Sequence, residues 1–451
     1  MLFSCSGGIS QKKTDTSNQV KMFKLMTVDP GHFHAALVQK SMYAQLSNDV
    51  YVFAPEGSDL QQHLDRIKSF NARSDSPTSW NEIVYSGADF FEKMISEKPG
   101  NVVVLSGNNR KKADYIVRSV NAGLNVLADK PMIINAADFP LLEEAFSTAS
   151  KNGVLLYDIM TERYEITTIL QKALSRNEEI FGRLQAGSIE EPAVEKVSVH
   201  HFAKYVSGKS LIRPSWFFDV EQQGEGIVDV TTHLVDLVQW ECFPDSLLSK
   251  HDIEIGNSKR WATQITKDQF REVTGTEDYP GFLEKDIKNG DLSVFSNGEF
   301  VYRIKGIWAK VSVEWKFKAP EGGGDTHYSI MRGSNCNLVI RQTAEEKFKP
   351  ELYVEKVRGS DIDAFSLKLK KVLASLPYDS ITVVKVNADV LRIGIPAKYR
   401  VSHEDHFAQV TSKFLNYLNE GKIPEWEIQA MITKYYTTTS ALKKAIRTDS
   451  R

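Results

Sequence analysis

The sequence predicts an α/β protein with two sheet-based parts, a doubly wound parallel sheet followed by an α+β domain with a largely antiparallel sheet. Three observations support this class. Strand and helix patterns alternate from residue 22 to residue 150, long strands with period-two alternation follow from residue 195, and amphipathic helices close the chain. Alternating strands and helices build a parallel sheet with helices on both faces, whereas consecutive half-buried strands build an antiparallel sheet.

The first domain is expected over residues 22–150, where short apolar strands rich in β-branched residues are separated by helices. The strands are expected at residues 24–28, 50–54, 101–107 and 125–131. The helices are expected at residues 34–46, 58–70, 90–96, 112–123 and 136–153. Residues 71–81 contain the serines, aspartate and proline that are typical of a surface loop.

The second domain is expected over residues 151–446. Its strands are expected at residues 154–160, 196–203, 292–297, 299–319, 337–342 and 351–357. The closing helices, at residues 403–424 and 426–446, are expected to pack back near the first domain. The block at residues 245–400 carries no motif that indicates a function.

The composition excludes several classes of function. The 451 residues contain 56 Lys and Arg and 58 Asp and Glu, and this balance gives no reason to expect a nucleic-acid or membrane-surface partner. The sequence has no run of about twenty apolar residues, so no transmembrane segment is expected. The cysteines Cys5, Cys242 and Cys336 lie far apart, which argues against a disulfide framework and a cysteine-rich zinc site.

Residues 1–21 are too polar to join a core and are expected to be disordered. Within them, the stretch "LFSC" before the first glycines resembles the cleavage box of a bacterial lipoprotein, but the apolar region that should precede it is missing. The segment is therefore either an ordinary polar start or a lipoprotein precursor with a trimmed signal. A cytoplasmic, a periplasmic and a lipid-anchored location all stay open.

Two later motifs carry a family resemblance. The stretch "AGLNVLADKP", residues 122–131, resembles the Ala-Gly-Lys-His-Val-Leu-x-Glu-Lys-Pro signature of the Gfo/Idh/MocA family of NAD(P)-dependent oxidoreductases, with Asp129 in place of Glu. The stretch "GEGIVDVTTHLVDLVQW", residues 224–240, resembles the family's Gly-Gly-x-x-x-Asp-x-Gly-x-His-x-x-Asp motif. The resemblance covers residues 22–240 and 400–446, and it implies a Rossmann NAD-binding domain over residues 22–150.

With this resemblance, the stretch "DPGHFH" at residues 29–34 is interpreted as the cofactor loop. Gly31 matches the second glycine of Gly-x-Gly-x-x-Gly, which lets the backbone approach a pyrophosphate, while Asp29 and His34 replace the first and third. A metal site is not predicted, because two histidines need a third ligand and none is signalled nearby. Cofactor contacts are expected from Asp29, Gly31, His32, Phe33, Glu56, Asn109, Asp129 and Lys130. Because Glu56 follows the second strand without a basic neighbour, NAD is favoured over NADP.

The catalytic chemistry is assigned around one predicted helix. Asp229, His233 and Asp236 share a face if residues 228–240 are helical. The resemblance implies that His233 is the acid/base, that Asp229 assists it, and that Lys130 polarises the substrate oxygen. Substrate contacts are expected from Arg163, Arg213, Trp216 and Asp236. The "RPSWFFD" loop, residues 213–219, combines an aromatic and a basic group, which suits a sugar ring.

The function implied is an NAD-dependent oxidoreductase that transfers hydride between a nicotinamide cofactor and a secondary hydroxyl of a sugar, glycoside or polyol. Family habit also implies a homo-oligomer, either a dimer or a tetramer. Two alternatives stay open. The chain could be an NAD-dependent glycosidase that oxidises its sugar transiently and eliminates the aglycone, or a ligand-sensing protein of the same fold without turnover.

Overall fold

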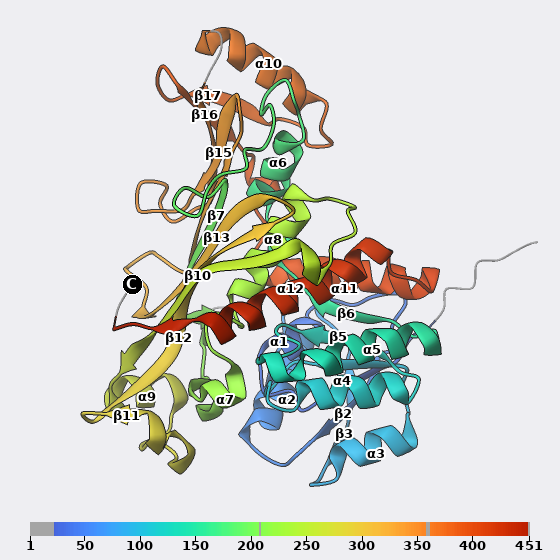
Figure 1. The fold of residues 1–451 in the computed structure, drawn as a ribbon. Helices are drawn as coiled ribbons and strands as arrows, with labels where there is room; N and C mark the ends of the chain where they lie inside the picture. The colour runs from blue at the N-terminus through green and yellow to red at the C-terminus, as the bar shows by residue number, and fades with distance from the viewer. Residues whose placement is uncertain (1–21, 207–208, 358–360, 450–451) are drawn as a thin grey trace, which may run out of the picture.

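The computed structural model describes residues 22–206, 209–357 and 361–449. The expected disordered segment, with Cys5, lies outside these residues. Figure 1 shows a parallel sheet wrapped by helices and a second, longer sheet, with the closing helices (red) lying between the two. This architecture confirms the predicted fold class. No helix within the described ranges is both long and apolar enough to cross a membrane.

The N-terminal sheet has six parallel strands in the order β3-β2-β1-β4-β5-β6. The strands are β1 Leu25–Val28, β2 Asp49–Ala54, β3 Asn81–Ser86, β4 Val102–Leu105, β5 Asn125–Asp129 and β6 Leu156–Ile159. The strand order reverses between β1 and β4, and open α/β sheets bind ligands at such a point, outside the carboxyl ends of the strands. The loop at residues 29–34 and the Lys130 turn both leave carboxyl ends of this sheet.

Helices cover both faces of the sheet (Figure 1). They are α1 His34–Leu37, α2 Ser58–Ala72, α3 Phe90–Glu97, α4 Lys112–Asn121 and α5 Phe139–Asn152. The helix α1 is much shorter than predicted, because the chain leaves helical geometry after Val38 instead of continuing to residue 46.

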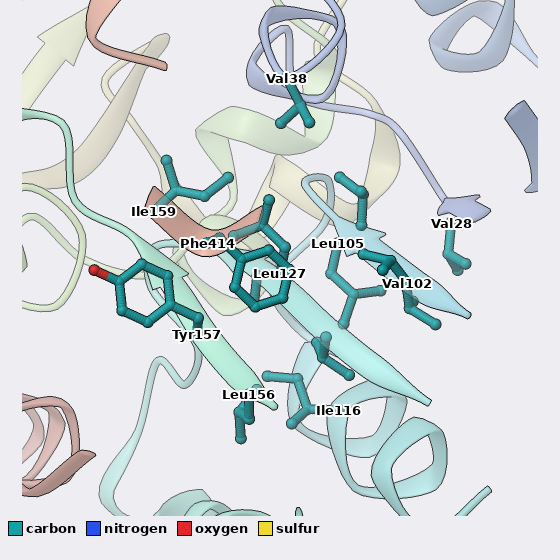
Figure 2. Close-up of a cluster of buried hydrophobic side chains, with 14 of the residues drawn as sticks. Val28, Val38, Val102, Leu105, Ile116, Leu127, Leu156, Tyr157, Ile159 and Phe414 are labelled. Atoms are coloured by element: carbon teal, nitrogen blue, oxygen red, sulfur yellow. The ribbon is translucent and has the colours of Figure 1, made fainter. Parts of the chain in front are cut away.

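The core of this part also includes the C-terminal helix α11 (His403–Glu420). In Figure 2, Phe414 of α11 lies with Leu127 and Tyr157 of the sheet. The rings of Tyr157 and Phe414 are nearly parallel, with centroids 5.9 Å apart. The packing of the last helices on β6 therefore joins the two ends of the described chain in one apolar cluster.

The second sheet has eleven strands and is mostly antiparallel, with β7 parallel to β13 and β10 parallel to β19. Its order is β17-β18-β16-β15-β14-β7-β13-β12-β10-β19, and β11 pairs with β12. The strands are β7 Val194–Ala203, β10 Ile253–Ile265, β11 Ile287–Lys288, β12 Asp291–Ile304, β13 Ile307–Lys318, β14 Thr326–Arg332, β15 Cys336–Arg341, β16 Glu351–Lys356, β17 Thr382–Lys385, β18 Val390–Gly394 and β19 Ile446–Arg447. The strands β8 Tyr205–Val206 and β9 Lys209–Ser210 pair in a separate two-stranded antiparallel sheet.

The remaining helices connect the sheets. They are α6 Ile166–Ser175, α7 Val220–Gln223, α8 Thr231–Cys242, α9 Lys267–Thr274, α10 Ile362–Ala374 and α12 Glu425–Lys444. Short 3₁₀ turns include η2 (Glu162–Tyr164), directly after β6, and η3 (Ser215–Phe218). The helix α8 is buried on almost every side, because α6, α12, β7 and β13 all contact it.

Strand β3 and the hairpin from β12 to β13 are among the elements that differ from the sequence prediction. Strand β3 was not predicted, because its apolar run, Ile83 to Tyr85, is only three residues long and is flanked by polar residues at the exposed edge of the sheet. The single strand expected at residues 299–319 is a hairpin, β12 to β13. It turns at Lys305 and Gly306, both with positive φ, as a two-residue turn between twisted strands requires.

Candidate functional site

A cavity of about 320 Å³ lies between the carboxyl end of the parallel sheet and the face of the second sheet. Its wall is formed by the loop after β1, the turn after β5, and residues from η2, α6, β7, α8, β14 and α11. Seven of the ten histidines of the chain line it: His32, His34, His200, His233, His327, His403 and His406. No single segment of the sequence contains a pattern of charged residues that predicts this cavity. Its wall is assembled from residues spread over most of the chain.

Lys130 and Asp229 contact each other in the wall of the cavity. Lys130 follows β5 and is joined to Pro131 by a cis peptide bond. Its Nζ lies 2.5 Å from Asp229 Oδ1. The buried Lys112 of α4 donates to the carbonyls of Asp129 and Pro131, at 2.9 and 3.1 Å, and so fixes the turn that presents Lys130. The structure therefore brings together two of the three predicted catalytic residues in direct contact.

His233 lies in the first turn of α8 and lines the same cavity. The residue is 8 % exposed, and its Nδ1 has no hydrogen-bond partner. Burial, and secondly the charge of Lys130, lower the pKa of His233 to about 3, so the ring is neutral at neutral pH. The neutral imidazole has a lone pair that can accept a proton, but a pKa of about 3 makes it a weak base at neutral pH, below the range that suits a general base. Asp229 lies in the turn before α8, not within the helix as predicted.

The loop at residues 29–34 makes a tight turn beside β4. Asp29 has a φ of 47°, the Gly31 N–H donates to Asp29 O at 2.8 Å, and the His32 N–H donates to Ser106 O at 3.1 Å. Burial, reinforced by Asp59, raises the pKa of Asp29 to about 6. The Asp29 carboxyl therefore carries its negative charge less readily than an ordinary aspartate would at this position.

Gly31 leaves no room for a larger residue. A Cβ there would lie 2.8 Å from Asp59 Oδ2 and 2.9 Å from Trp216 Cζ2. The Trp216 indole N–H donates to Asp59 Oδ2 at 2.7 Å. Trp216, predicted to contact substrate, thus lies against the cofactor loop instead of in the cavity lining. Glu56 is exposed, and Asp59, which the sequence analysis did not single out, is the carboxylate that approaches Gly31.

Asn109 follows β4 at the point where the strand order reverses. Its N–H donates to Gln222 O at 2.9 Å and its Nδ2 to Gln223 O at 2.7 Å. Its Oδ1 has no partner although the residue is only 4 % exposed. A buried acceptor without a donor, beside a glycine turn with close backbone approach, fits a dinucleotide at this crevice.

His32, His34 and Asp129 form a cluster in which His34 and Asp129 are buried and His32 is half-buried. Asp129 Oδ2 lies 2.9 Å from His34 Nδ1 and 3.5 Å from His32 Nδ1, and it accepts from Ser106 Oγ at 2.9 Å. Their ligand-type atoms all lie within 4.8 Å of one another. Asp129 is therefore the third group that the sequence failed to signal beside the two histidines. Asp129 stands where the family motif has Glu, and His34 stands where the dinucleotide loop has its third glycine. These two substituted residues contact each other.

Phe33, the remaining predicted loop residue, lines the cavity. Burial lowers the pKa of both His32 and His34 well below the usual range, so both rings are neutral. Residues 32–34 thus present one aromatic and two neutral imidazole rings where the loop meets the cavity.

Two predicted substrate residues, Arg163 and Asp236, belong to a sealed ion-pair network. Arg163 Nε and Nη2 donate to Asp236 at 2.6 and 2.7 Å, and Lys434 Nζ donates to Asp236 Oδ1 at 2.8 Å. Glu427 accepts from Arg163 at 3.2 Å, and Asp158 pairs with Lys434 at 2.7 Å. Neither Arg163 nor Asp236 lines the cavity, so the expectation of substrate contact is corrected: their charges bind the closing helix α12 to α8.

Arg213 lines the cavity, but much of its guanidinium is engaged in holding the wall. Nε donates to Phe202 O at 2.7 Å and Nη2 to His201 O at 3.0 Å. The guanidinium carbon lies 4.4 Å from the Phe217 ring centre. Burial lowers the pKa of Arg213 to about 10, so the group keeps its charge at neutral pH.

Several cavity residues, Asp325 among them, escaped the sequence analysis, whereas Lys204 and His200 were polar candidates without an assigned role. Lys204 and Asp325 pair at 3.0 Å, and Asp325 also contacts His200. Other overlooked residues are Glu162, His327, His403 and His406. The only sequence signal was the spacing of His403 and His406, three apart at a predicted helix start, which places two histidines on one face.

Comparisons with known proteins agree with this architecture. A family model described as "Putative oxidoreductase C terminal domain" matches residues 170–446. The crystal structure of a "putative oxidoreductase" from Parabacteroides merdae is 56 % identical, with a TM-score of 0.90, and the match covers 94 % of this chain and 97 % of that chain. No protein of curated function matches the sequence.

More distant structures share the fold. KijD10, a 3-ketoreductase from Actinomadura kijaniata in complex with NADP and TDP-benzene, is 12 % identical with a TM-score of 0.54, over 96 % of this chain and 100 % of that chain. GenD2 from gentamicin A biosynthesis, in complex with NAD, is 13 % identical with a TM-score of 0.56, over 97 % of each chain. The chain belongs to the oxidoreductase family that the C-terminal domain model describes, and it is a Gfo/Idh/MocA-type oxidoreductase.

Proposed function

We propose that the protein transfers hydride between NAD and a secondary hydroxyl of a sugar, glycoside or polyol. The observation that carries this proposal is the contact of Lys130 with Asp229 beside the neutral, unpartnered imidazole of His233, all at one cavity. An ammonium and a neutral base at one site are the two groups that oxidation of an alcohol requires.

Lys130, His233 and Asp229 have separate roles in the proposed reaction. The substrate hydroxyl binds between the Lys130 ammonium and the His233 ring. His233 takes the hydroxyl proton, and the Lys130 charge stabilises the oxygen as negative charge develops on it. Asp229 holds Lys130 in position through the 2.5 Å contact. When bound, the nicotinamide supplies the acceptor for the hydride that leaves the carbon.

The nucleotide would be held by residues of the crevice at the reversal of strand order. Gly31 and Asn109 lie there, one without room for a side chain and the other with a free acceptor. Asp59 is a carboxylate beside the same loop, so it would accept hydrogen bonds from a ribose and repel a 2′-phosphate. These features favour NAD over NADP.

The sugar class of the substrate is supported by the distant relatives and by the lining of the cavity. KijD10 is a 3-ketoreductase solved with TDP-benzene, and GenD2 takes part in gentamicin A biosynthesis. The cavity of the present chain offers aromatic rings, Trp315 and Phe217 among them, together with many polar side chains. A sugar ring has apolar C–H faces and hydroxyl groups at its edge, so it can use both the aromatic and the polar side chains.

The test begins with the nucleotide. The purified protein is denatured, and any released nucleotide is identified by chromatography and mass; without release, NAD and NADP are titrated. We expect NAD(H). Methyl glycosides carrying deuterium on each oxidisable carbon are then supplied, and transfer of deuterium to NADH identifies both the reaction and the carbon. Absence of NAD and NADP binding would refute the proposal. Release of an aglycone without net NADH would identify transient oxidation instead.

A further inference from the structure

Glu162, His327 and His403 form a second polar cluster in the wall of the cavity. The three residues come from η2 after β6, from β14 and from the start of α11. Glu162 Oε2 lies 3.4 Å from His327 Nε2, and Oε1 lies 3.3 Å from His403 Nδ1. Although burial favours protonation, contacts with His327 and His403 hold the pKa of Glu162 well below its usual range. Glu162 is therefore an ionised acceptor shared by two imidazoles.

The neighbouring His406 has no partner of its own. The residue is 3 % exposed, and neither ring nitrogen forms a hydrogen bond. Burial lowers the pKa of His406 to about 4, so the neutral ring offers one donor and one acceptor. Buried polar atoms without partners are rare in folded proteins, and a hydroxyl, which both donates and accepts, would satisfy such a ring.

The lysines of the described cavity wall are paired with carboxylates, and Arg213, the guanidinium of the lining, donates to the backbone carbonyls of Phe202 and His201. Lys130 pairs with Asp229 at 2.5 Å, Lys196 with Glu241 at 2.9 Å, and Lys204 with Asp325 at 3.0 Å. Sites for phosphate instead present free lysine or arginine groups, often two or more, to the anion. A phosphate in this cavity would lose its hydration beside ionised Glu162 and Asp325 without gaining an unpaired ammonium.

From this arrangement we propose that Glu162, His327, His403 and His406 form a second binding subsite for an uncharged, hydroxyl-bearing sugar. The cavity then takes neutral glycosides and rejects sugar phosphates and nucleotide-linked sugars. This inference rests on the proposed oxidoreductase function and deepens it by naming the substrate class. Trp315 and Phe217, which line the same cavity, provide aromatic surface for the C–H face of the ring.

The experiment measures binding and turnover separately on the full chain. Calorimetry compares methyl glucoside and a neutral disaccharide with glucose 6-phosphate and UDP-glucose, in the presence and absence of NAD. We expect the neutral sugars to bind and the phosphorylated ones to bind about a hundredfold more weakly, because a desolvated anion lacks a partner.

The variant Glu162→Gln keeps the shape of the side chain and removes its charge. We expect the KM for the neutral glycoside to rise by about ten- to a hundredfold, with kcat changed by less than about threefold and NAD affinity unchanged. Glu143→Gln is the matched control, because Glu143 pairs with Lys250 at 2.7 Å and is not part of the cavity lining. It should leave both constants at the wild-type values.

Three outcomes would overturn the inference. The first is preferential binding or oxidation of UDP-glucose or a sugar phosphate, which would leave the oxidoreductase function intact. The second is a fall in kcat alone in Glu162→Gln. The third is a stoichiometric divalent metal, measured by elemental analysis of the purified protein and lost in Glu162→Gln. Failure of the protein to bind any nicotinamide nucleotide would instead refute the proposed function, while calorimetry would still test the subsite.

Discussion

Two groups of titratable side chains lie at the start and in the middle of α8, and they differ in what surrounds them. Asp229 and His233 face the cavity, where His233 keeps an unpartnered nitrogen. Asp236, three residues further along, is enclosed by Arg163 and Lys434 and has both carboxylate oxygens paired. The comparison teaches that spacing on a helix does not identify function. Incomplete hydrogen bonding beside a cavity indicates chemistry, whereas complete pairing in the interior indicates structure.

The largest expected effect is on catalysis at the cavity. Lys130→Met removes the ammonium while keeping a chain of similar length. We expect kcat/KM for a neutral glycoside to fall by about a hundred- to ten-thousandfold, because the oxygen loses its stabilising charge. Deuterium transfer to NADH is the measurement. Near-normal turnover with a normal thermal midpoint would contradict the assignment and make Lys130 a structural partner of Asp229.

The next effect is on stability in the sealed network. Asp236→Asn removes the carboxylate charge that pairs with the buried cations Arg163 and Lys434. Because buried charges without a partner are destabilising, we expect the free energy of unfolding to fall by about 3–5 kcal/mol. Urea denaturation measures it. The control is Glu97→Gln in α3, which breaks an exposed pair with Lys93 and should cost less than about 1 kcal/mol.

Activity measurements on the same variant sharpen the comparison. Asp236→Asn should retain wild-type KM and kcat per folded molecule, since its carboxylate does not line the cavity. A raised KM with unchanged stability would restore the original expectation that Asp236 contacts substrate.

The smallest expected effect is on the pH dependence of stability, which tests whether the cavity residue His406 is neutral in the folded protein. The folded-state pKa of His406 is lowered to about 4, below the ordinary 6.5, so the unfolded chain binds a proton more readily than the native state between these values. Stability should therefore fall as the pH drops below 6.5, by about 2 kcal/mol at pH 5 for this residue. Urea denaturation at pH 7.5, 6 and 5 tests this. His406→Asn should flatten the dependence, and an identical slope in the variant would exclude His406 as its source.

Much of the fold could be predicted because its signals are local. The strands β1, β2, β4 and β5 are buried on both faces and so appear as short apolar runs. The edge strand β3 lacks that burial, and its apolar run of three residues was too short to predict a strand. The turn at Lys305 and Gly306 was overlooked because continuous alternation on either side concealed two residues with positive φ.

Only part of the candidate site could be predicted from the sequence. Lys130, Asp229 and His233 could be assigned, since each lies in a motif that resembles the family's. Glu162, His327 and His403 could not, because each is an isolated residue in a different segment. Arg163 and Trp216 were assigned to substrate because they lie in segments that resemble the family's, but their packing partners, Asp236 and Asp59, lie far away in sequence.

By itself, then, the sequence determined the alternation of strands and helices, the class of the fold, and the family motifs. These depend on periodicity and on short runs, which neighbouring residues set. The tertiary structure alone decided which charges are paired and which face the cavity: Asp236 is sealed by Arg163 and Lys434, while His233 keeps a free nitrogen. Ion pairing and burial depend on contacts between residues distant in sequence, and folding fixes those contacts only when the two sheets and the closing helices assemble.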